Sequence, residues 1–585
     1  MREITQAVEP YVAALSEEAI EAKKIKGEVP ILVIMGNPPY SGHSKNIGDW
    51  ITNLIEDYKK VDGKPLRERN PKWLQDDYVK FIRFGQWKIE KAGQGILAFI
   101  TNHSYLDNPT FRGMRQSLIK TFNEIYILDL HGNSLKKEKC PDGSKDENVF
   151  DIQQGVAIAI FIKESGARGN KVYYADLWGV REKKYQWLED NDAASTKWRT
   201  LAPKPEMYFF VPRSEKQEKQ YLSFWKITDI FAVNSVGIVT SRDNLVFDFE
   251  KRNLRQRIEA LRGKGLSDDL LKATYNIKEN PRWKIAKARE EIRRIEDLDK
   301  NIVKCLYRPF DIRYLFYHDA VIERSRKEVM RHMMQENLGL LTSRQAQGGF
   351  RHALVTDQIA DLNSTGTAGK YGSGYLFPLY LYPDSDKKDL FAIAGEIKSP
   401  NLSKELLKIL CDAFKKEPKP EEIFYYIYAI LYANTYRAKY AEFLKTDFPR
   451  IPFTKDVEVF KEMAGLGKEL VELHLLKSKK LDKSIAKFPA KDGCKVEKRE
   501  YKEKEERIYI NDKQYFSGVA KEVWNYYIGG YQVLDKWLKE REDRVLSDDD
   551  IAHFLKVIAA LSHTIELQKG IDKLYPKVEK ALLGN

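Results

Sequence analysis

The 585-residue sequence has few cysteines and no long apolar segment. Its four cysteines, Cys140, Cys305, Cys411 and Cys494, are far apart and form no CxxC pair, which argues against a disulfide framework and a structural zinc site. No run of about 18 apolar residues is present, and the N-terminus lacks the charged-then-apolar layout of a signal peptide. We therefore expect a cytoplasmic protein that is neither secreted nor inserted in a membrane.

Several common catalytic signatures are also missing. The sequence has no GxxxxGK[ST] phosphate loop, no GxGxxG loop and no HExxH metal-protease motif. What is present is a globular composition, with 43% hydrophobic and 32% charged residues. Lys and Arg number 99 against 86 Asp and Glu, and the resulting net charge of +13 is compatible with a polyanionic partner. Single cores stop growing near about 250–300 residues, so the length predicts two or three domains.

Four short apolar runs alternate with helical patterns in the first third of the chain. The runs span residues 30–35, 95–101, 124–130 and 155–162, and the helical patterns span residues 78–91 and 111–122. Such runs are typical of strands buried on both faces of a parallel sheet, so the alternation predicts a doubly wound, Rossmann-like α/β sheet. Ligands of such sheets bind at the carboxyl ends of the strands, where Asn37-Pro38-Pro39-Tyr40 follows the first run.

The pattern changes near residue 205. Short strand-like pieces then mix with charged helices, which predicts a mixed α+β region. Leu254, Ile258 and Leu261 have the spacing of one buried helix face. The C-terminal part reads as helical, and its predicted buried face carries Trp524, Tyr527, Tyr531, Leu534 and Trp537.

The tetrapeptide Asn37-Pro38-Pro39-Tyr40 suggests a specific chemistry. Two prolines fix the backbone and remove two N–H donors, which leaves the Pro38 carbonyl and the Asn37 side-chain oxygen as two acceptors in a rigid fork. This fork suits an exocyclic amine, which could attack an activated methyl group, while the Tyr40 ring stacks on the base. Flipping the base out of a duplex costs roughly a few kcal/mol, which stacking of about 1–3 kcal/mol helps to offset. The alternative is a proline-rich turn that only ends a strand.

Phe150, which directly precedes the fourth apolar run, supports the same chemistry. With this residue and the tetrapeptide, the sequence resembles the amino-methyltransferases that modify adenine N6. In that family Asn-Pro-Pro-Tyr is the catalytic motif, and an aromatic residue before a later strand closes on the flipped base. The resemblance implies that Asn37, Pro38, Pro39 and Tyr40 are catalytic and that Tyr40 and Phe150 stack on the target base. The alternative for Phe150 is a core position.

Longer segments resemble the methyltransferase and specificity parts of type ISP restriction–modification enzymes. They comprise residues 36–44, 110–115, 129–133, 307–311, 375–380 and 447–452. The resemblance covers nearly the whole chain. It implies adenine-N6 methylation from S-adenosylmethionine within an asymmetric target, in a large single chain that also carries a nuclease and a translocase.

This resemblance also implies a division of the chain into three parts. Residues 1–204 form the catalytic part of a methyltransferase sheet, residues 205–460 a mixed α+β target-recognition domain for double-stranded DNA, and residues 461–585 a helical part of the specificity region.

The sequence departs from the type ISP pattern at its start. Only 36 residues precede Asn37, and none of them forms an aromatic-x-Gly-x-Gly cofactor loop. We therefore expect a sheet that is incomplete at its N-terminal half, and a chain that binds S-adenosylmethionine poorly by itself. The chain resembles the carboxyl-terminal part of such an enzyme and could be the product of a split gene, a truncated gene product or a fragment. A split-gene subunit would work with an upstream nuclease–translocase–cofactor-binding polypeptide.

Basic residues interleaved with aromatics mark the predicted specificity region. Arginine can bind guanine edges or phosphates, so these residues are candidate DNA ligands. They are Arg308, Arg313, Arg324, Arg326, Arg331, Arg344, Arg437 and Lys439. The alternative for each is an internal ion pair, and the alternative for the tyrosines around Arg437 is core packing.

Three further interpretations stay open. The chain could be a non-catalytic specificity subunit that lends half an active site to a partner, an N4-cytosine methyltransferase, or a degenerate remnant. We expect no metal site, and we expect structural roles for His43 and His103 because an adenine amine needs little beyond positioning.

Overall fold

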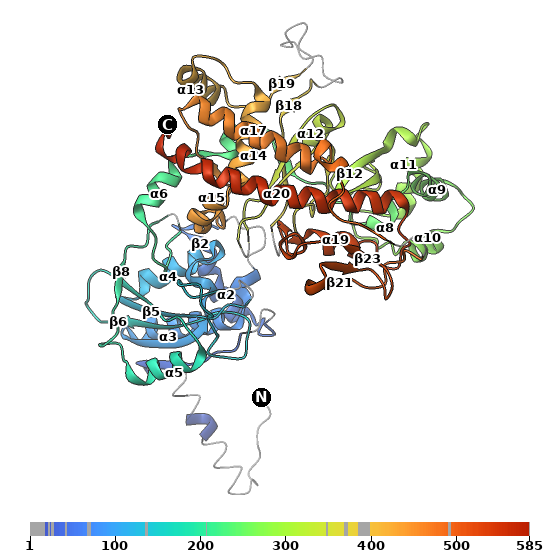
Figure 1. Ribbon diagram of the computed structural model, residues 1–585. Coiled ribbons are helices and arrows are strands. Elements are labelled where there is room, and N and C mark those ends of the chain that lie inside the picture. Colours follow the sequence, from blue (N-terminus) through green and yellow to red (C-terminus); the bar gives the residue numbers. More distant parts are fainter. Residues whose placement is uncertain are drawn as a thin grey trace, which may run out of the picture. The chain divides into compact units, whose positions relative to one another are not determined.

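The computed structural model describes eleven segments of the chain in two compact units, Met1–Ser214 and Glu215–Asn585 (Figure 1). The described residues are 18–21, 24, 29–40, 44–66, 72–134, 138–205, 207–346, 349–367, 372–383, 398–489 and 493–583. His43 lies outside them.

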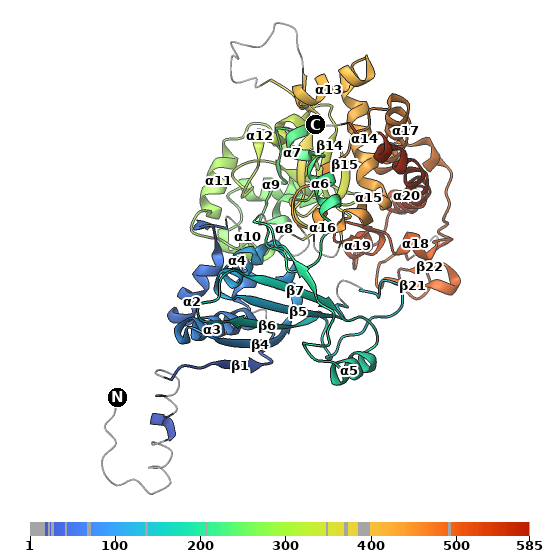
Figure 2. The ribbon, with the colours of Figure 1, turned by 90° about the vertical axis from the view of Figure 1, so that its left-hand side faces the viewer.

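The first unit is built on a six-stranded sheet, and all four predicted apolar runs form strands in it. These are β1 (Val33–Gly36), β4 (Gly95–Asn102), β5 (Glu124–His131) and β6 (Val156–Lys163). They are joined by β7 (Lys171–Asp176) and β8 (Arg199–Leu201), in the spatial order β1-β4-β6-β5-β7-β8. Figure 2 shows this order from β1 to β7. The predicted helices form as α3 (Asp77–Ala92) and α4 (Arg112–Thr121). The α/β class is thus confirmed.

The sheet is mixed rather than parallel throughout. β1 pairs with β4 in parallel, but β6 lies between β4 and β5 and runs antiparallel to both. The described residues of the connection from β5 to β6 contain no helix. Parallel neighbours are usually joined by a helical crossover, so this connection is consistent with the antiparallel pairing. The carboxyl ends of β1, β4 and β5 and the start of β6 therefore meet at one edge.

The core of the first unit lies between the sheet and α3. Val79 and Ile82 of α3 and Leu97 of β4 are fully buried. Gly85 permits the close approach, since a Cβ there would lie 2.5 Å from a methyl group of Leu97. This packing holds β4 in place, and with it the chain segments that directly follow β1 and β4.

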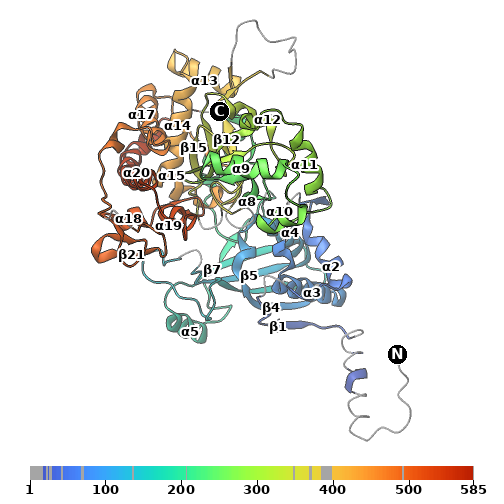
Figure 3. The ribbon, with the colours of Figure 1, turned by 90° about the vertical axis from the view of Figure 1, so that its right-hand side faces the viewer.

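β1 differs from the prediction of a strand buried on both faces. Leu32, Val33 and Met35 are exposed, and Ile34 is half-buried against the core. β1 pairs with β4 only, so it is the edge strand of the sheet (Figures 2 and 3). The apolar run correctly indicated a strand, but neither a neighbouring strand nor a helix covers it in the described residues.

The second unit contains two four-stranded sheets. One combines β10 (Ser235–Val236), β17 (Tyr375–Pro378), β14 (Gly339–Thr342) and β15 (Ala353–Thr356). The other combines β11 (Phe247–Asp248), β13 (Asp311–Phe316), β12 (Ile302–Arg308) and β16 (Ile359–Ala360). The helices α14 (Pro420–Tyr432), α17 (Val457–His474) and α20 (Asp548–Lys580) pack against one another. The predicted helix face of Leu254, Ile258 and Leu261 is fully buried in α9 (Lys251–Arg262).

The predicted C-terminal helix is interrupted by a hairpin. Trp524 ends the short α18 (Lys521–Trp524), while Tyr527 and Tyr531 lie in the hairpin of β24 (Tyr527–Ile528) and β25 (Tyr531–Gln532). The turn at Gly529, with φ of 58°, breaks the helical spacing. Leu534 and Trp537 are buried in α19 (Val533–Lys539), as the pattern indicates.

The C-terminal elements share a core with earlier parts of the second unit. Trp537 and Phe554 belong to the same buried cluster as Leu254 and Leu315, so the region after residue 461 is not a separate core. No helix in the described residues combines the length and apolar character needed to cross a membrane.

Candidate active site

The edge where β1, β4 and β5 end carries the predicted catalytic and base-stacking residues. Asn37–Tyr40 directly follow β1, and Phe150 lies on the connection that enters β6 at the same edge. Tyr40 and Phe150 both pack against one small apolar cluster formed by Leu128, Leu130, Val149 and Val156. The structure therefore brings the tetrapeptide and the second aromatic residue together.

The Asn37–Tyr40 corner is open to solvent at its asparagine. Asn37 and Pro39 are exposed, Pro38 is buried, and Tyr40 is half-buried. The Tyr40 hydroxyl lies 2.8 Å from Asn37 Oδ1, to which it donates, and 3.1 Å from the carbonyl oxygen of Ile100. Burial raises the pKa of Tyr40 to about 12, so this hydroxyl stays a donor at neutral pH. The contact orients the Asn37 amide without removing it from solvent.

Phe150 is held by a clamp that the sequence did not reveal. The Asn148 side chain accepts from the Phe150 backbone N–H at 2.9 Å and donates to the carbonyl oxygens of Gly132 and Gln154. Arg181, the first residue of α5 (Arg181–Asp190), donates to the carbonyl oxygens of Asn148 and Phe150 at 2.8 and 3.0 Å. The backbone on both sides of Val149 is thus tied to α5.

A buried charged network lies at the same edge. His103, just after β4, places Nδ1 3.0 Å from Asp129 Oδ1. His131, at the end of β5, places Nε2 3.0 Å from Asp176 and stacks on Trp178 at 3.4 Å. Burial alone would raise the pKa of Asp129, but the neighbouring imidazoles outweigh it and hold that pKa well below its usual range.

This network also fixes the connection that carries Phe150. His103 donates its backbone N–H to the Gly155 carbonyl, and a Cβ at Gly155 would lie 2.5 Å from the His103 ring. His103 is buried, as expected for a structural role. The sequence singled out His103 and the segment 129–133, but not Asp176 or Trp178, because these two partners lie far from them along the chain.

One group of side chains in the described residues could hold a metal ion. Ligand atoms of His103, His131 and Glu138 lie within 4.8 Å of one another. Both imidazoles already have carboxylate partners, Asp129 and Asp176. Hydrogen bonding and ion pairing therefore account for this arrangement.

Two of the predicted DNA ligands form ion pairs with acidic side chains of the same unit. Arg308 is buried, with Nη1 2.8 Å from Asp361. Arg313 lies 2.8 Å from Asp311 and 2.7 Å from Glu540. These contacts are internal ion pairs of the second unit, the alternative that the sequence left open.

Three more predicted ligands face neighbouring elements. Arg331 donates to the carbonyl oxygen of Tyr382 at 2.9 Å, and Arg437 to that of Leu431 at 2.6 Å. Lys439 reaches both carboxylate oxygens of Glu579 at 2.8 Å. The helix that carries Arg437 and Lys439, α15 (Asn434–Lys439), also buries Tyr436 and packs on α20, so its contacts are those of core packing.

The remaining predicted ligands are accessible. Arg324 is exposed, and its backbone pairs with Val239. Arg326 is partly exposed and has a positive φ of 55° at the start of α12 (Lys327–Met330). Arg344 is exposed and lies 3.3 Å from Asp447. These three are the candidates whose guanidinium groups could reach a ligand.

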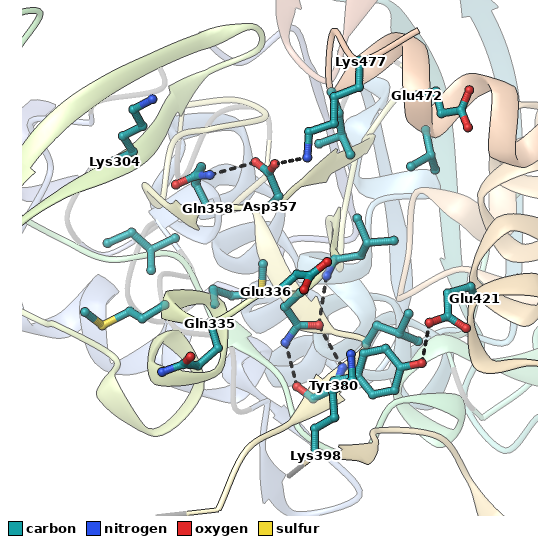
Figure 4. A pocket seen from close by; sticks show the side chains of 18 of the residues that line it. Lys304, Gln335, Glu336, Asp357, Gln358, Tyr380, Lys398, Glu421, Glu472 and Lys477 are labelled. Carbon is teal, nitrogen blue, oxygen red and sulfur yellow. Dashed lines mark hydrogen bonds and ion pairs between the residues drawn. The ribbon is translucent and has the colours of Figure 1, made fainter.

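A cleft of about 630 Å³ opens elsewhere in the second unit (Figure 4). Two pairs lie in its polar lining, with Lys477 2.6 Å from Asp357 and the Tyr380 hydroxyl 2.5 Å from Glu421. None of the residues lining it belongs to the predicted catalytic or DNA-binding set.

Two family models match the sequence. The type ISP C-terminal specificity domain matches residues 229–569, which is more than half of the chain, and the Eco57I restriction-modification methylase matches residues 11–135. The comparison with curated proteins found no match.

Three solved structures of larger proteins have similar folds. A nuclease-deletion mutant of the type ISP enzyme LlaGI in complex with a DNA substrate mimic matches 97% of this chain at 21% identity, with a TM-score of 0.66. The type ISP enzyme LlaBIII bound to DNA matches 97% at 23% identity and a TM-score of 0.68, and a DrdV–DNA complex matches 96% at 24% and 0.64. The matched region spans 46%, 39% and 58% of those chains. At these identities the likeness shows the fold.

Proposed function

Since this chain belongs to the family of the type ISP C-terminal specificity domain and carries an Eco57I restriction-modification methylase region, we propose that it is the methyltransferase and target-recognition portion of a site-specific adenine-N6 DNA methyltransferase. We assign methyl transfer to the first unit, whose sheet is the carboxyl half of a doubly wound methyltransferase sheet. Target recognition belongs to the second unit, which contains the matched specificity region.

The observation that carries this proposal is the geometry of the Asn37–Tyr40 corner. Asn37 is exposed at the carboxyl edge of the sheet and oriented by the Tyr40 hydroxyl at 2.8 Å. Its Oδ1 and the Pro38 carbonyl would be the two acceptors for the N6 hydrogens of a flipped adenine. S-adenosylmethionine would supply the methyl group: the S–CH3 bond would break as the N6–CH3 bond forms, S-adenosylhomocysteine would leave, and the surplus N6 proton would pass to solvent. Tyr40 and Phe150, which pack on one apolar cluster, stack on the base.

This account predicts weak cofactor binding by the isolated chain. S-adenosylmethionine needs a glycine-rich loop beside its amino-acid end, and the sequence has none before Asn37. We expect isothermal titration of the purified chain with S-adenosylmethionine to show no saturable binding in the micromolar range. Micromolar binding by the chain alone would contradict an incomplete cofactor site.

The clamp on Phe150 predicts an effect of Arg181 on base stacking. Arg181→Ala removes the hydrogen bonds to the carbonyl oxygens of Asn148 and Phe150, so Phe150 should lose its fixed position. We expect a several-fold smaller fluorescence rise from 2-aminopurine at the target position in the cofactor-complemented enzyme. Lys183→Ala, an exposed neighbour on α5, is the control and should leave the signal unchanged. Equal signals for both variants would contradict the role of the clamp.

The accessible arginines predict a salt-dependent effect on DNA binding. Arg324→Ala or Arg326→Ala should weaken binding to duplex DNA, and loss of one phosphate contact should lower the slope of log K against log salt by about one. Fluorescence anisotropy over a salt series measures this slope. Arg282→Ala, an exposed arginine outside the predicted set, is the control. An unchanged slope in both test variants would remove these arginines from the interface.

A further inference from the structure

Several connections of the second unit meet at one end of the sheet formed by β10, β17, β14 and β15. Thr342, the last residue of β14, lies opposite Ala353, the first residue of β15, and opposite Tyr375, the first residue of β17. β10 ends at the same place, with Val236 opposite Tyr375. Loops held at one end of a rigid sheet commonly carry binding residues. The described residues 342–346, 349–352, 361–367 and 372–374 are called the loop edge below.

The hairpin of β24 and β25 ties two segments of the loop edge together. The backbone N–H of Gly529 donates to the carbonyl oxygen of Arg351 at 2.7 Å, and that of Gly530 donates to the carbonyl oxygen of Thr365 at 2.9 Å. Gly529 has a φ of 58°, and a Cβ there would lie 1.6 Å from the Thr365 carbonyl oxygen. Only glycine fits this contact, so the hairpin braces the backbone on which Arg351 stands.

The side chain of Arg351 is exposed and rests on the same hairpin. Its guanidinium lies over the Tyr527 ring, 5.1 Å from the ring centre. In the part of the chain that the structure describes, no ion pair occupies this guanidinium, in contrast with Arg308 and Arg313. Stacking covers one face of the planar group and leaves the N–H groups at its edge available. A fixed backbone and a stacked side chain lose little freedom on binding, which favours a bidentate contact.

Buried hydroxyl groups of the loop edge lack hydrogen-bond partners. Thr342 Oγ1, Ser364 Oγ and Thr365 Oγ1 are buried and have no partner among the described residues. Buried polar groups are nearly always paired, so such hydroxyls need an explanation. Gly374 lies against two of them, because a Cβ there would be 2.8 Å from Ser364 Oγ and 3.3 Å from Thr365 Oγ1. This unused hydrogen-bonding capacity favours a polar ligand at the loop edge.

Further cations border the loop edge. Arg344 belongs to it and is exposed. Arg324, also exposed, pairs through its backbone with Val239, and the preceding residue, Ile238, accepts a hydrogen bond from the backbone of Leu362 in the loop edge. Duplex DNA is a polyanion whose phosphates flank every base, so cations around one base-reading side chain match its charge.

We propose that Arg351 is a specificity-determining residue whose guanidinium forks to a guanine edge in the major groove, and that Gly529 is the positioning residue that places it. The inference rests on the proposed function, because it assigns one contact to target recognition by the second unit. Arginine bound to O6 and N7 of guanine is the commonest specific contact to duplex DNA. A phosphate clamp would need neither the Tyr527 stack nor a braced backbone, since a flexible cation suffices for a phosphate.

The reading role is tested with the full chain. Selection from a random duplex library gives its preferred sequence, and fluorescence anisotropy gives its affinities for that duplex and for a scrambled one. Arg351→Lys keeps the charge but loses the fork, so we expect the ratio of the two affinities to fall at least about tenfold, with little change for the scrambled duplex. A second selection should lose the preference at one G·C pair. Arg282→Lys, at an exposed arginine outside the loop edge, is the control and should keep the ratio.

The positioning role is tested with Gly529→Ala. Displacement of Arg351 should lower the affinity ratio as Arg351→Lys does, and combining the two changes should lower it no further, because both act on one contact. Gly465→Ala, where a Cβ has room, is the control. Tyr527→Leu removes the ring beneath Arg351 without a clash and should also lower the ratio, so the role stays testable if Gly529→Ala does not fold.

The outcomes separate base reading from methyl transfer. An unchanged affinity ratio for Arg351→Lys would overturn the reading role. Equal losses of affinity for the preferred and scrambled duplexes in Gly529→Ala and Tyr527→Leu would overturn the positioning role. A wild-type chain without sequence preference would overturn both, together with target recognition by the second unit. If the Arg351 results hold but nucleoside analysis detects no N6-methyladenine, the inference stands and the proposed methyl transfer fails.

Discussion

Replacing Asn37 by alanine should lower kcat for methyl transfer about 10²–10³-fold in the cofactor-complemented enzyme, while DNA binding stays near the wild-type level. The side chain supplies one of two acceptors that hold the amine as its nitrogen becomes tetrahedral, and removal of one positioned hydrogen-bond group in an active site typically has this effect. Transfer of a labelled methyl group under single-turnover conditions measures the loss.

The exposed position of Asn37 makes this prediction specific for catalysis. Asn37 contacts Tyr40 at 2.8 Å and is not part of the core, so Asn37→Ala should unfold at nearly the wild-type temperature. Asn37→Asp keeps an acceptor oxygen and should retain more activity than Asn37→Ala. Equal activity of wild type and Asn37→Ala would refute the proposal that the Asn37 side chain and the Pro38 carbonyl together hold the target amine.

Replacing Lys184 by methionine should reduce the free energy of unfolding of the first unit by about 3–5 kcal/mol, because it leaves a buried carboxylate without its cation. The Lys184 and Asp146 side chains are both fully buried, with Nζ 2.7 Å from Oδ1. Lys184 also donates to the carbonyl oxygens of Leu130 and Glu147. The pair thus ties α5 to the end of β5 and to the connection that carries Phe150.

Urea denaturation followed by circular dichroism measures this effect. Lys183→Met, on the exposed side of the same helix, should change stability by less than about 0.5 kcal/mol. The double variant Lys184→Met, Asp146→Asn should recover part of the loss, because both charges are then removed while an amide oxygen remains as an acceptor for the backbone N–H groups of Gly132 and Gly179. If Lys184→Met were as stable as wild type, Lys184 and Asp146 would not form a buried ionic contact in solution.

Local patterns in the sequence were sufficient to predict the strands and the position of the tetrapeptide. The runs at 95–101, 124–130 and 155–162 form β4, β5 and β6 nearly residue for residue. The direction of β6 could not be read from its run, because an apolar strand has the same pattern in either direction. The structure shows that β6 runs antiparallel to β5, after a connection with no helix in its described residues.

Partners distant in sequence explain why the arginines could not be sorted beforehand. Arg313 reaches Glu540, 227 positions away, and Lys439 reaches Glu579, 140 positions away. The sequence around Arg313 and around Lys439 is basic and aromatic in the same way, so composition does not distinguish their environments. Whether a guanidinium faces a carboxylate or solvent depends on tertiary packing, and the same is true of the network around Asp129.

Nucleoside mass analysis of DNA treated with the cofactor-complemented enzyme tests the central claim most directly. The account predicts N6-methyladenine at a single site per recognition sequence, formed by the wild-type enzyme and lost in Asn37→Ala. Detection of N4-methylcytosine alone, or of the same N6-methyladenine yield from Asn37→Ala, would contradict an adenine amine held between Asn37 and Pro38.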